Sequence, residues 1–270
     1  MKLLKLISPL LLTILPGCAS LGDRPDPATL NELAPTGKLR FGLVFAPEQS
    51  VFFVVKGADG TPRGVSVDLA NELAQHAGVP VEFVLAPNSG IVTDAVASGS
   101  IDAAFMPVDD ERRKLLGIGP IYLFDENTYL VRAGSDIKSI AEVDRPGVRV
   151  IGIAGTTTIR SAGRTLKNAK ISPAASVEAA LEMLRSGQAD AFALTHQTLP
   201  ALAVRVPGSR ILEGAFQRIN IAVVLPKDRP NALAYVTGWM EGAKASGAVR
   251  RALDKAGFKD IPVAPPTTAP

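Results

Sequence analysis

The sequence predicts an α/β protein made of two similar lobes with a ligand cleft between them. Strand-like and helix-like segments alternate along the chain, which favours parallel sheets with right-handed helical crossovers. One segment pattern occurs twice. A chain of 270 residues with 47% apolar and 20% charged side chains also lies near the length at which chains split into two cores. A cleft between two such lobes is a common place for a small ligand.

The first eighteen residues are predicted to be a secretory signal peptide. Two lysines precede an apolar run from Leu6 to Pro16, which is shorter than the ~20 residues of a membrane span. The segment ending in Pro16-Gly17-Cys18 is similar to a bacterial lipobox, and Cys18 is the only cysteine. We therefore expect a periplasmic or otherwise extracytoplasmic protein that is tethered by lipidated Cys18. An ordinary signal peptide with an incidental cysteine is the alternative.

The ends of the chain are polar and rich in proline, so we expect a flexible tether before the folded part and a disordered tail after it. The last helical segment has no repeat partner after it and is expected to return to the first lobe. The predicted division is a signal peptide at 1–18, a tether at 19–36, a first lobe at 37–124 and 221–260, a second lobe at 125–220, and a tail at 261–270. Crossover segments are expected near 124–130 and 215–221.

Strands are predicted where short apolar runs are bounded by turn residues. In chain order these are Lys38–Phe45, Phe52–Lys56, Val81–Ala86, Ile101–Met106, Arg149–Ile153, Ala169–Pro173, Ala189–Leu194 and Arg218–Pro226. Helices are predicted where apolar residues recur every three or four positions. In chain order these are Val67–Ala77, Ile91–Ser98, Thr157–Leu166, Val177–Arg185 and Ala232–Ala243.

The repeated pattern joins a helix end to a buried strand. Ser98–Phe105 (SGSIDAAF) matches Ser186–Ala193 (SGQADAFA), at a separation of 88 residues. Each copy has a glycine at the helix end, a two-residue turn, an aspartate and an apolar run. We expect one copy in each lobe; a coincidence in an alanine-rich chain is the alternative.

Composition excludes several classes of function. The 29 Lys and Arg against 26 Asp and Glu leave a formal net charge of +3 with no basic block, and aromatic residues make up only 5%, so a nucleic-acid partner is not expected. One cysteine and two histidines exclude a disulfide framework and most Cys/His metal sites. We expect neither a metal nor a cofactor.

Two groups of polar residues follow predicted strands. The first is Met106–Lys114, directly after the predicted strand end, and it includes Val108 and Arg112; an arginine there can present a planar fork to a carboxylate. In the second, Gly155-Thr156-Thr157 lies between a strand and a helix and offers hydroxyls and free N–H groups, with ordinary N-capping as the alternative. The repeat places the two groups on opposite lobes, where they can hold one carboxylate between them.

Five stretches in this order resemble a known family. They are Gly64–Ala70, Gly99–Phe105, Glu111–Lys114 with Pro120–Tyr122, Gly155–Thr157 and Ser186–Ala191. The chain resembles the extracytoplasmic solute-binding proteins of ABC importers, specifically the family that binds polar amino acids (bacterial solute-binding protein family 3). The resemblance implies two Rossmann-like lobes joined by two crossover strands, the type II periplasmic binding fold.

The resemblance also implies roles for individual residues. Arg112 is expected to bind the ligand carboxylate together with Thr156 and Thr157. An aromatic residue after the first strand is expected to cover the ligand, and Phe45 matches that place, with Phe52 as the alternative. We include Val108 and Thr195, at two strand ends, among the ligand-binding candidates.

This chain departs from the family pattern at the place of the ammonium group. Thr195 aligns with an aspartate that pairs with the ligand ammonium, and Met106-Pro107 replaces two hydroxyl residues. A compensating carboxylate such as Glu48, or a carboxylate ligand without an ammonium, would each account for the threonine.

We therefore expect a monomeric binding protein without enzymatic activity. It is predicted to close around a small carboxylate-bearing solute, an amino acid or a related compound, and to deliver it to the transmembrane subunits of an ABC permease. Two alternatives are a dehydratase of cyclic acids on the same fold, with Glu48 or Asp125 as the reacting carboxylate, and a ligand-sensing adaptor with a degenerate pocket.

Overall fold

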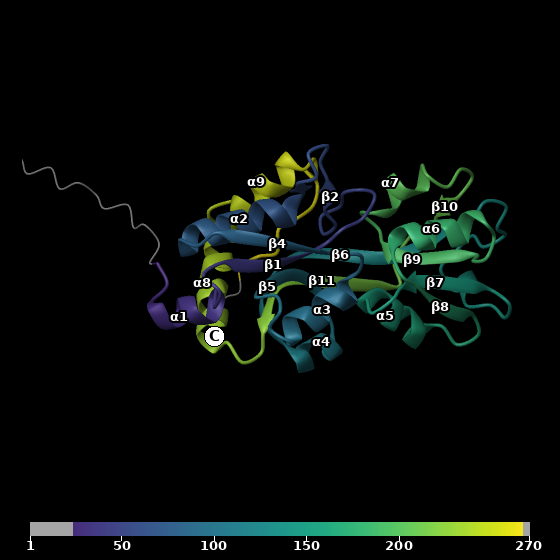
Figure 1. Ribbon diagram of the computed structural model, residues 1–270. Helices are drawn as coiled ribbons and strands as arrows, with labels where there is room; N and C mark the ends of the chain where they lie inside the picture. The colour runs from purple at the N-terminus through teal and green to yellow at the C-terminus, as the bar shows by residue number, and fades with distance from the viewer. Residues whose placement is uncertain (1–23, 267–270) are drawn as a thin grey trace, which may run out of the picture.

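The computed structural model describes residues 24–266. The predicted signal peptide, including Cys18, and the last residues of the predicted tail lie outside the described residues. Within that range the chain forms two α/β lobes side by side along a shared sheet (Figure 1). The predicted α/β fold class is confirmed.

The shared sheet has nine strands in the order β4-β1-β5-β11-β6-β9-β7-β8, with β10 paired to β6. Its strands are β1 (Leu39–Val44), β4 (Val81–Ala86), β5 (Ala103–Val108), β6 (Leu116–Val131), β7 (Arg149–Ile153), β8 (Lys170–Ala174), β9 (Ala191–Thr195), β10 (Arg210–Ile211) and β11 (Gln217–Pro226). A separate pair is formed by β2 (Val55–Lys56) and β3 (Pro62–Arg63).

Helices cover both faces of this sheet, and the interior strand β5 is accordingly apolar and buried throughout. They are α1 (Pro27–Leu33), α2 (Val65–Ala77), α3 (Ser89–Ala97), α4 (Asp110–Leu115), α5 (Thr157–Thr165), α6 (Val177–Arg185), α7 (Leu199–Ala203), α8 (Pro230–Ala245) and α9 (Ala248–Lys255), with a 3-10 turn at Ala141–Val143. Figure 1 shows α3, α4 and α5 on one face, and α2, α9 and α6 on the other.

The long strands β6 and β11 connect the lobes. They pair antiparallel with each other from Gln217↔Asn127 to Pro226↔Leu116. The N-terminal half of β6 lies in the first lobe, with β1, β4 and β5, whereas its C-terminal end pairs with β9 in the second lobe, with β7 and β8. The predicted crossover segment 124–130 lies within β6, and the segment 215–221 overlaps the beginning of β11. The residue-by-residue division into lobes stays a prediction.

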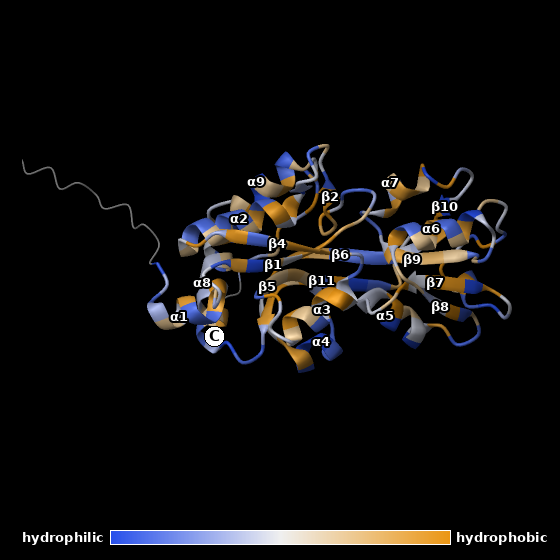
Figure 2. Cartoon of the chain, in the orientation of Figure 1, coloured by the Kyte–Doolittle hydropathy of each residue, from blue (hydrophilic) through white to orange (hydrophobic). Residues whose placement is uncertain are grey.

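Each lobe has its own aromatic packing. In the first lobe, the ring of Phe105 lies between those of Phe41 and Tyr122, at centroid distances of 4.9 and 5.0 Å. In the second lobe, Tyr129 and Phe216 stack at 4.6 Å. Figure 2 shows hydrophobic residues along β5 and β7, where the sheet is covered on both faces.

The repeat in the sequence corresponds to one structural device used in both lobes. Asp102 accepts hydrogen bonds from the backbone N–H and the guanidinium of Arg40, at 2.6 to 2.9 Å. Asp190 accepts the same set from Arg149, at 2.8 to 2.9 Å. The repeated aspartate directly precedes β5 in the first lobe and β9 in the second. In each lobe it therefore ties the beginning of the neighbouring strand, β1 or β7, to that strand.

The predicted tether is wrong over part of its length, because α1 lies within 19–36. The side chain of Asp26 caps this helix by accepting the Thr29 N–H at 2.8 Å, and Pro27 occupies its first position. Leu33 is buried, and α1 packs on α8. Burial of this apolar side chain outweighs the polar, proline-rich composition that suggested a flexible segment.

The beginning of the predicted tail is also ordered. Val263 forms a bridge with Leu123 of β6, and the Ala264 N–H donates to the Tyr122 carbonyl at 2.9 Å. The edge of β6 within the first lobe offers free backbone groups, and the tail satisfies them. The expectation of disorder from residue 261 is therefore wrong as far as residue 266.

Candidate functional site

Arg112 lies on α4, directly after the buried strand β5. Asp109 caps this helix by accepting the Arg112 N–H at 3.1 Å. Arg112 is 1% exposed. Its guanidinium is held by backbone and hydroxyl oxygens. It donates to the Pro107 carbonyl at 2.5 Å, to the carbonyl and hydroxyl of Ser89 at 3.0 and 2.7 Å, and to the Gly155 carbonyl of the second lobe at 3.4 Å.

The buried charge of Arg112 has no carboxylate within ion-pair distance among residues 24–266. Burial, together with repulsion from Arg160, lowers the pKa of Arg112 to about 9, so it is still charged at neutral pH. Its Nε has no hydrogen-bond partner in the described structure. A buried guanidinium held only by neutral oxygens is suited to receive an anion.

The N-terminus of α5 faces this guanidinium. Thr156 is the N-cap: its hydroxyl accepts the Ile159 N–H at 3.2 Å and donates to the Ile153 carbonyl at 2.7 Å. Ordinary capping therefore occupies the Thr156 hydroxyl. Thr157 is 1% exposed, and its hydroxyl has no partner among the described residues, so its side chain is the one free to bind.

Besides the hydrogen bond from Arg112 to Gly155, three contacts join the lobes around this site. Arg160 of α5 forms an ion pair with Asp109 at 2.6 Å, and the Asn88 amide donates to the Ala175 carbonyl at 3.1 Å. Gly90 and Gly155 approach so closely that a Cβ built on either glycine lies 2.8 Å from the Cα of the other. The lobes are thus in contact along α3, α4 and the N-terminus of α5.

Asp125 lies where β6 passes from one lobe to the other. It is 5% exposed; one carboxylate oxygen accepts the Glu126 N–H at 2.8 Å, and the other, Oδ2, has no partner in the described residues. Burial raises the pKa of Asp125 to about 7, and the nearby donors of Glu126, Gln197 and Thr195 oppose this only partly. A carboxylate thus lies beside Thr195, at the end of β9.

The remaining candidates occupy the edges of this region. Val108 is the last residue of β5 and is buried against Asn220 of β11. Phe45 follows β1, bridges to Val54, and carries the ammonium of Lys56 over its ring at 5.3 Å. The structure therefore brings Arg112 and the 155–157 turn together, whereas the contacts of Phe45 and Val108 are with their own lobe and with β11.

Sequence reasoning did not identify Ser89, Asn88 or Arg160 as site residues. Ser89 and Asn88 begin α3, and Asn88 caps it by accepting the Ile91 N–H at 3.0 Å. A capping signal is present in Asn88-Ser89 before the predicted helix, but it says nothing about contacts with Arg112. The contact of Arg160 with Asp109 spans 51 positions and depends on how the lobes meet.

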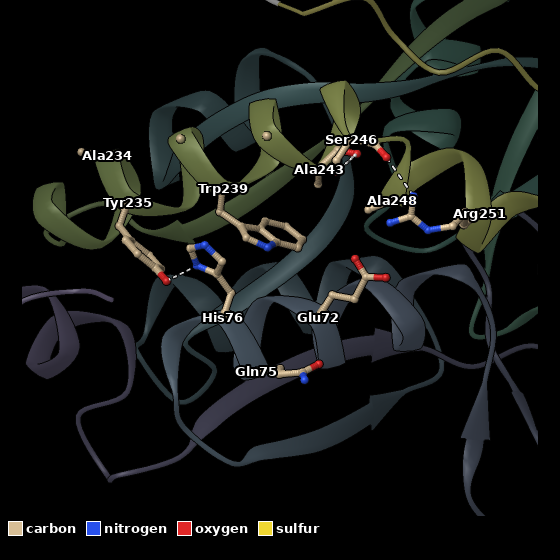
Figure 3. Close-up of a pocket in the computed structure, with 12 residues that line it drawn as sticks. Glu72, Gln75, His76, Ala234, Tyr235, Trp239, Ala243, Ser246, Ala248 and Arg251 are labelled. Atoms are coloured by element: carbon tan, nitrogen blue, oxygen red, sulfur yellow. Dashed lines mark hydrogen bonds between the residues drawn. The ribbon is translucent and has the colours of Figure 1, made fainter. Parts of the chain in front are cut away.

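Five cavities among the described residues lie elsewhere. None of the five described among residues 24–266 is lined by Arg112, Thr156 or Thr157. The largest, about 990 Å³, is a groove between α2 and the helices α8 and α9, on the outside of the first lobe. Figure 3 shows His76 and Tyr235 hydrogen-bonded at one end of it, beside Trp239. A cavity of about 180 Å³ lies beside Asp125.

Comparison with known proteins identifies relatives. The family model for "Bacterial extracellular solute-binding proteins, family 3" matches residues 44–259. The glutamine-binding protein of Geobacillus stearothermophilus is 24% identical over 252 residues, which cover 84% of this chain and 92% of that protein. Among described helices, none has the length and apolar character to cross a bilayer.

Two further similarities involve enzymes. The membrane-bound lytic murein transglycosylase F of Maricaulis maris (strain MCS10) is 28% identical over 173 residues, covering 61% of this chain and only 37% of that enzyme. The crystal structure of an ancestral amino acid-binding protein, AncCDT-1, a precursor of cyclohexadienyl dehydratase, matches with a TM-score of 0.73 and 27% identity. That match covers 84% of this chain and 98% of the other.

Proposed function

Since this chain belongs to family 3 of the bacterial extracellular solute-binding proteins, we propose that it captures an amino acid outside the cytoplasm and delivers it to an ABC permease. Members of this family are extracytoplasmic, and the similar glutamine-binding protein supports an amino acid as the class of ligand. The permease is proposed from the resemblance to importer binding proteins. The protein is proposed to act as a monomer and without catalysis.

The observation that carries this proposal is the uncompensated charge of Arg112. Removing a guanidinium from water costs several kcal/mol unless a counter-charge or strong hydrogen bonds repay it. Here the described partners are neutral oxygens, and Nε is unpaired. A ligand carboxylate placed between Arg112 and the Thr157 hydroxyl supplies the missing negative charge and satisfies two buried donors.

The ammonium group of the ligand is proposed to bind Asp125. Its Oδ2 atom is buried and unpaired, and it lies on the strand between the lobes, beside Thr195. A charge-assisted hydrogen bond to an ammonium is worth roughly 1.5–3 kcal/mol. Asp125 would thus provide the carboxylate that Thr195 lacks, in place of Glu48. Arg112 and Asp125 together would then recognise a zwitterion.

Binding requires the lobes to separate, because Arg112 and Gly155 lie in contact across them. Separation frees the guanidinium and exposes the N-terminus of α5. The ligand carboxylate then takes the place of the Gly155 carbonyl beside Arg112, and closure buries it. Such a hinge motion fits the two strands β6 and β11, which alone run through both lobes in the described sheet.

Calorimetry and a melting-temperature screen of Arg112→Lys against amino acids test this function. The lysine keeps the charge but loses the planar fork, so binding should weaken at least tenfold. Arg113→Lys is the matched control, because Arg113 is the exposed neighbour on the same helix. A wild-type protein that binds no amino acid, or an Arg112→Lys variant that binds like the wild type, would contradict the proposal.

The tether to the membrane is a separate proposal. Cys18 is proposed to carry a lipid, which would hold the protein near its permease. Metabolic labelling with a radioactive fatty acid should mark the wild type and not a Cys18→Ser variant. Labelling of both proteins, or of neither, would refute lipidation at this residue while leaving the ligand site untouched.

A dehydratase is the second candidate function, and one observation favours it. A carboxyl group with a pKa of about 7 can both give and accept a proton at neutral pH, and Asp125 has that property. The structural similarity to the dehydratase precursor is consistent with it. Incubation with prephenate or arogenate, followed by mass spectrometry, should show loss of water and carbon dioxide if this is correct. Loss of that activity in Asp125→Asn would assign the residue.

A further inference from the structure

The ion pair between Asp109 and Arg160 crosses from one lobe to the other and lies beside the ligand site. Nε of Arg160 donates to Oδ2 of Asp109 at 2.7 Å, and Nη2 lies 2.6 Å from the same oxygen. The side chain of Asp109 is 8% exposed and that of Arg160 is 27% exposed, so water and salt screen the pair only in part. Arg160 also donates to the Gly155 carbonyl at 3.1 Å.

Asp109 has a second task on its own lobe. Its other oxygen, Oδ1, accepts the backbone N–H of Arg112 and thereby caps α4. One carboxylate thus fixes the start of the helix that carries Arg112 and, through Arg160, ties that helix to α5. The carbonyl of Gly155 accepts hydrogen bonds from both arginines, so closure brings the two cations to one backbone oxygen.

We propose that the Asp109–Arg160 pair is a latch that stabilises the closed arrangement of the lobes before any ligand binds and positions Arg112 within it. The two side chains belong to different lobes, so their interaction exists only when the lobes are closed. The capping bond of Asp109 lies within the first lobe and persists in both arrangements. The latch therefore sets how much of the ligand-free protein is closed, which in turn sets the apparent affinity.

Because Asp109 also caps α4, the capping bond and the ion pair can be tested separately. Asparagine caps helices as well as aspartate does, so Asp109→Asn keeps the α4 cap but removes the charge that Arg160 needs. Arg160→Gln removes the other charge. Arg160→Lys retains a cation and should restore much of the effect. Arg164→Gln, an exposed position on the same helix, is the matched control.

The measurement is the distance distribution between two spin labels in ligand-free protein, placed by Lys114→Cys on α4 and Gly163→Cys on α5 in a Cys18→Ser background. Asp109→Asn and Arg160→Gln should each lower the ratio of closed to open protein about fivefold, the size expected for a partly exposed pair. The double variant should lower it no further.

Unchanged distances in both single variants, or additive effects in the double variant, would overturn the latch. An effect of Arg164→Gln equal to that of Arg160→Gln would also overturn it, by showing a general charge effect. Since no ligand is present, failure of the amino-acid proposal leaves this result interpretable. Conversely, a protein that binds amino acids but shows no latch keeps its function and loses only this device.

Discussion

Replacing Asp125 by asparagine should remove most of the pH dependence that this residue confers on stability. In the folded chain its pKa is about 7, against 3.8 for an ordinary aspartate. A difference of about three pKa units corresponds to about 4 kcal/mol, because each unit is worth 1.36 kcal/mol. The group is 5% exposed, so solvent screening takes little from this value.

The direction follows from which state holds the proton. Between about pH 4 and pH 7 the folded protein keeps a proton on Asp125 that the unfolded chain has released. The free energy of unfolding should therefore fall by up to about 4 kcal/mol as pH rises through this window, and then level off. Asp125→Asn lacks this slope. In urea unfolding, the free energy of unfolding of the variant relative to that of the wild type should therefore be higher at pH 8 than at pH 5.

Ligand binding should show the opposite dependence. An ammonium needs the ionised carboxylate, so the affinity of the wild type for its amino acid should fall about tenfold for each pH unit below 7, whereas Asp125→Asn should bind weakly at every pH. Glu126→Gln, at the exposed neighbouring residue, is the control. The reasoning would be refuted if the free energy of unfolding and the ligand affinity changed with pH in the same way in the wild type and in Asp125→Asn.

Two further substitutions test the contact between the lobes and the bond between Arg149 and Asp190. Gly90→Ala should weaken ligand binding at least tenfold without lowering the urea midpoint, because the new Cβ would lie 2.8 Å from the Gly155 Cα. The control is Gly163→Ala, whose Cβ would meet nothing within 4 Å and which should bind ligand normally in calorimetry. Asp190→Asn should cost about 1–2 kcal/mol at pH 7, since Arg149 holds the pKa of Asp190 well below its usual range. That difference should shrink in urea unfolding as the pH falls below 4.

The sequence predicted the central strands of both lobes, but of the long strand β6 that joins them it predicted only a crossover segment near 124–130. β5 is apolar and fully buried, so its pattern alone identifies it. β6 contains Gly117, Gly119 and Pro120 and then the polar run Asp125-Glu126-Asn127, residue types that are common in turns. Strands on both sides supply its hydrogen bonds, and those strands are distant in the sequence. Non-local pairing of this kind overrides local propensity.

The predicted strand at Phe52–Lys56 shows the reverse error. Only Val55 and Lys56 form a strand, although Phe52 and Phe53 are buried and of a type favoured in strands. The amides of both phenylalanines point at the hydroxyl of Ser50, at 3.2 and 2.9 Å, which closes a turn instead. Burial could be predicted there from composition, but the hydrogen-bond partner could not.

Within the candidate site, the repeat argument and the family resemblance both placed Arg112 together with the 155–157 turn. It did not find Arg160 or the burial of Asp125, because both depend on how one lobe lies against the other. Contact between lobes is encoded in surfaces that have no periodic pattern. From the sequence, Asp125 was a candidate only as an enzymatic carboxylate; its burial between the lobes, with Oδ2 unpaired among the described residues, supports its proposed part in binding.

The repeat separates residues that build the fold from residues that build the site. Asp102 and Asp190, 88 positions apart, make matching bonds at the start of a central strand. By the same spacing, Arg112 corresponds to Pro200, which has no guanidinium to offer. Scaffold residues can be duplicated because each lobe must fold by the same rules. A zwitterion has one positive and one negative end, so two identical half-sites cannot bind it. Asymmetry between the copies is therefore what the proposed ligand requires.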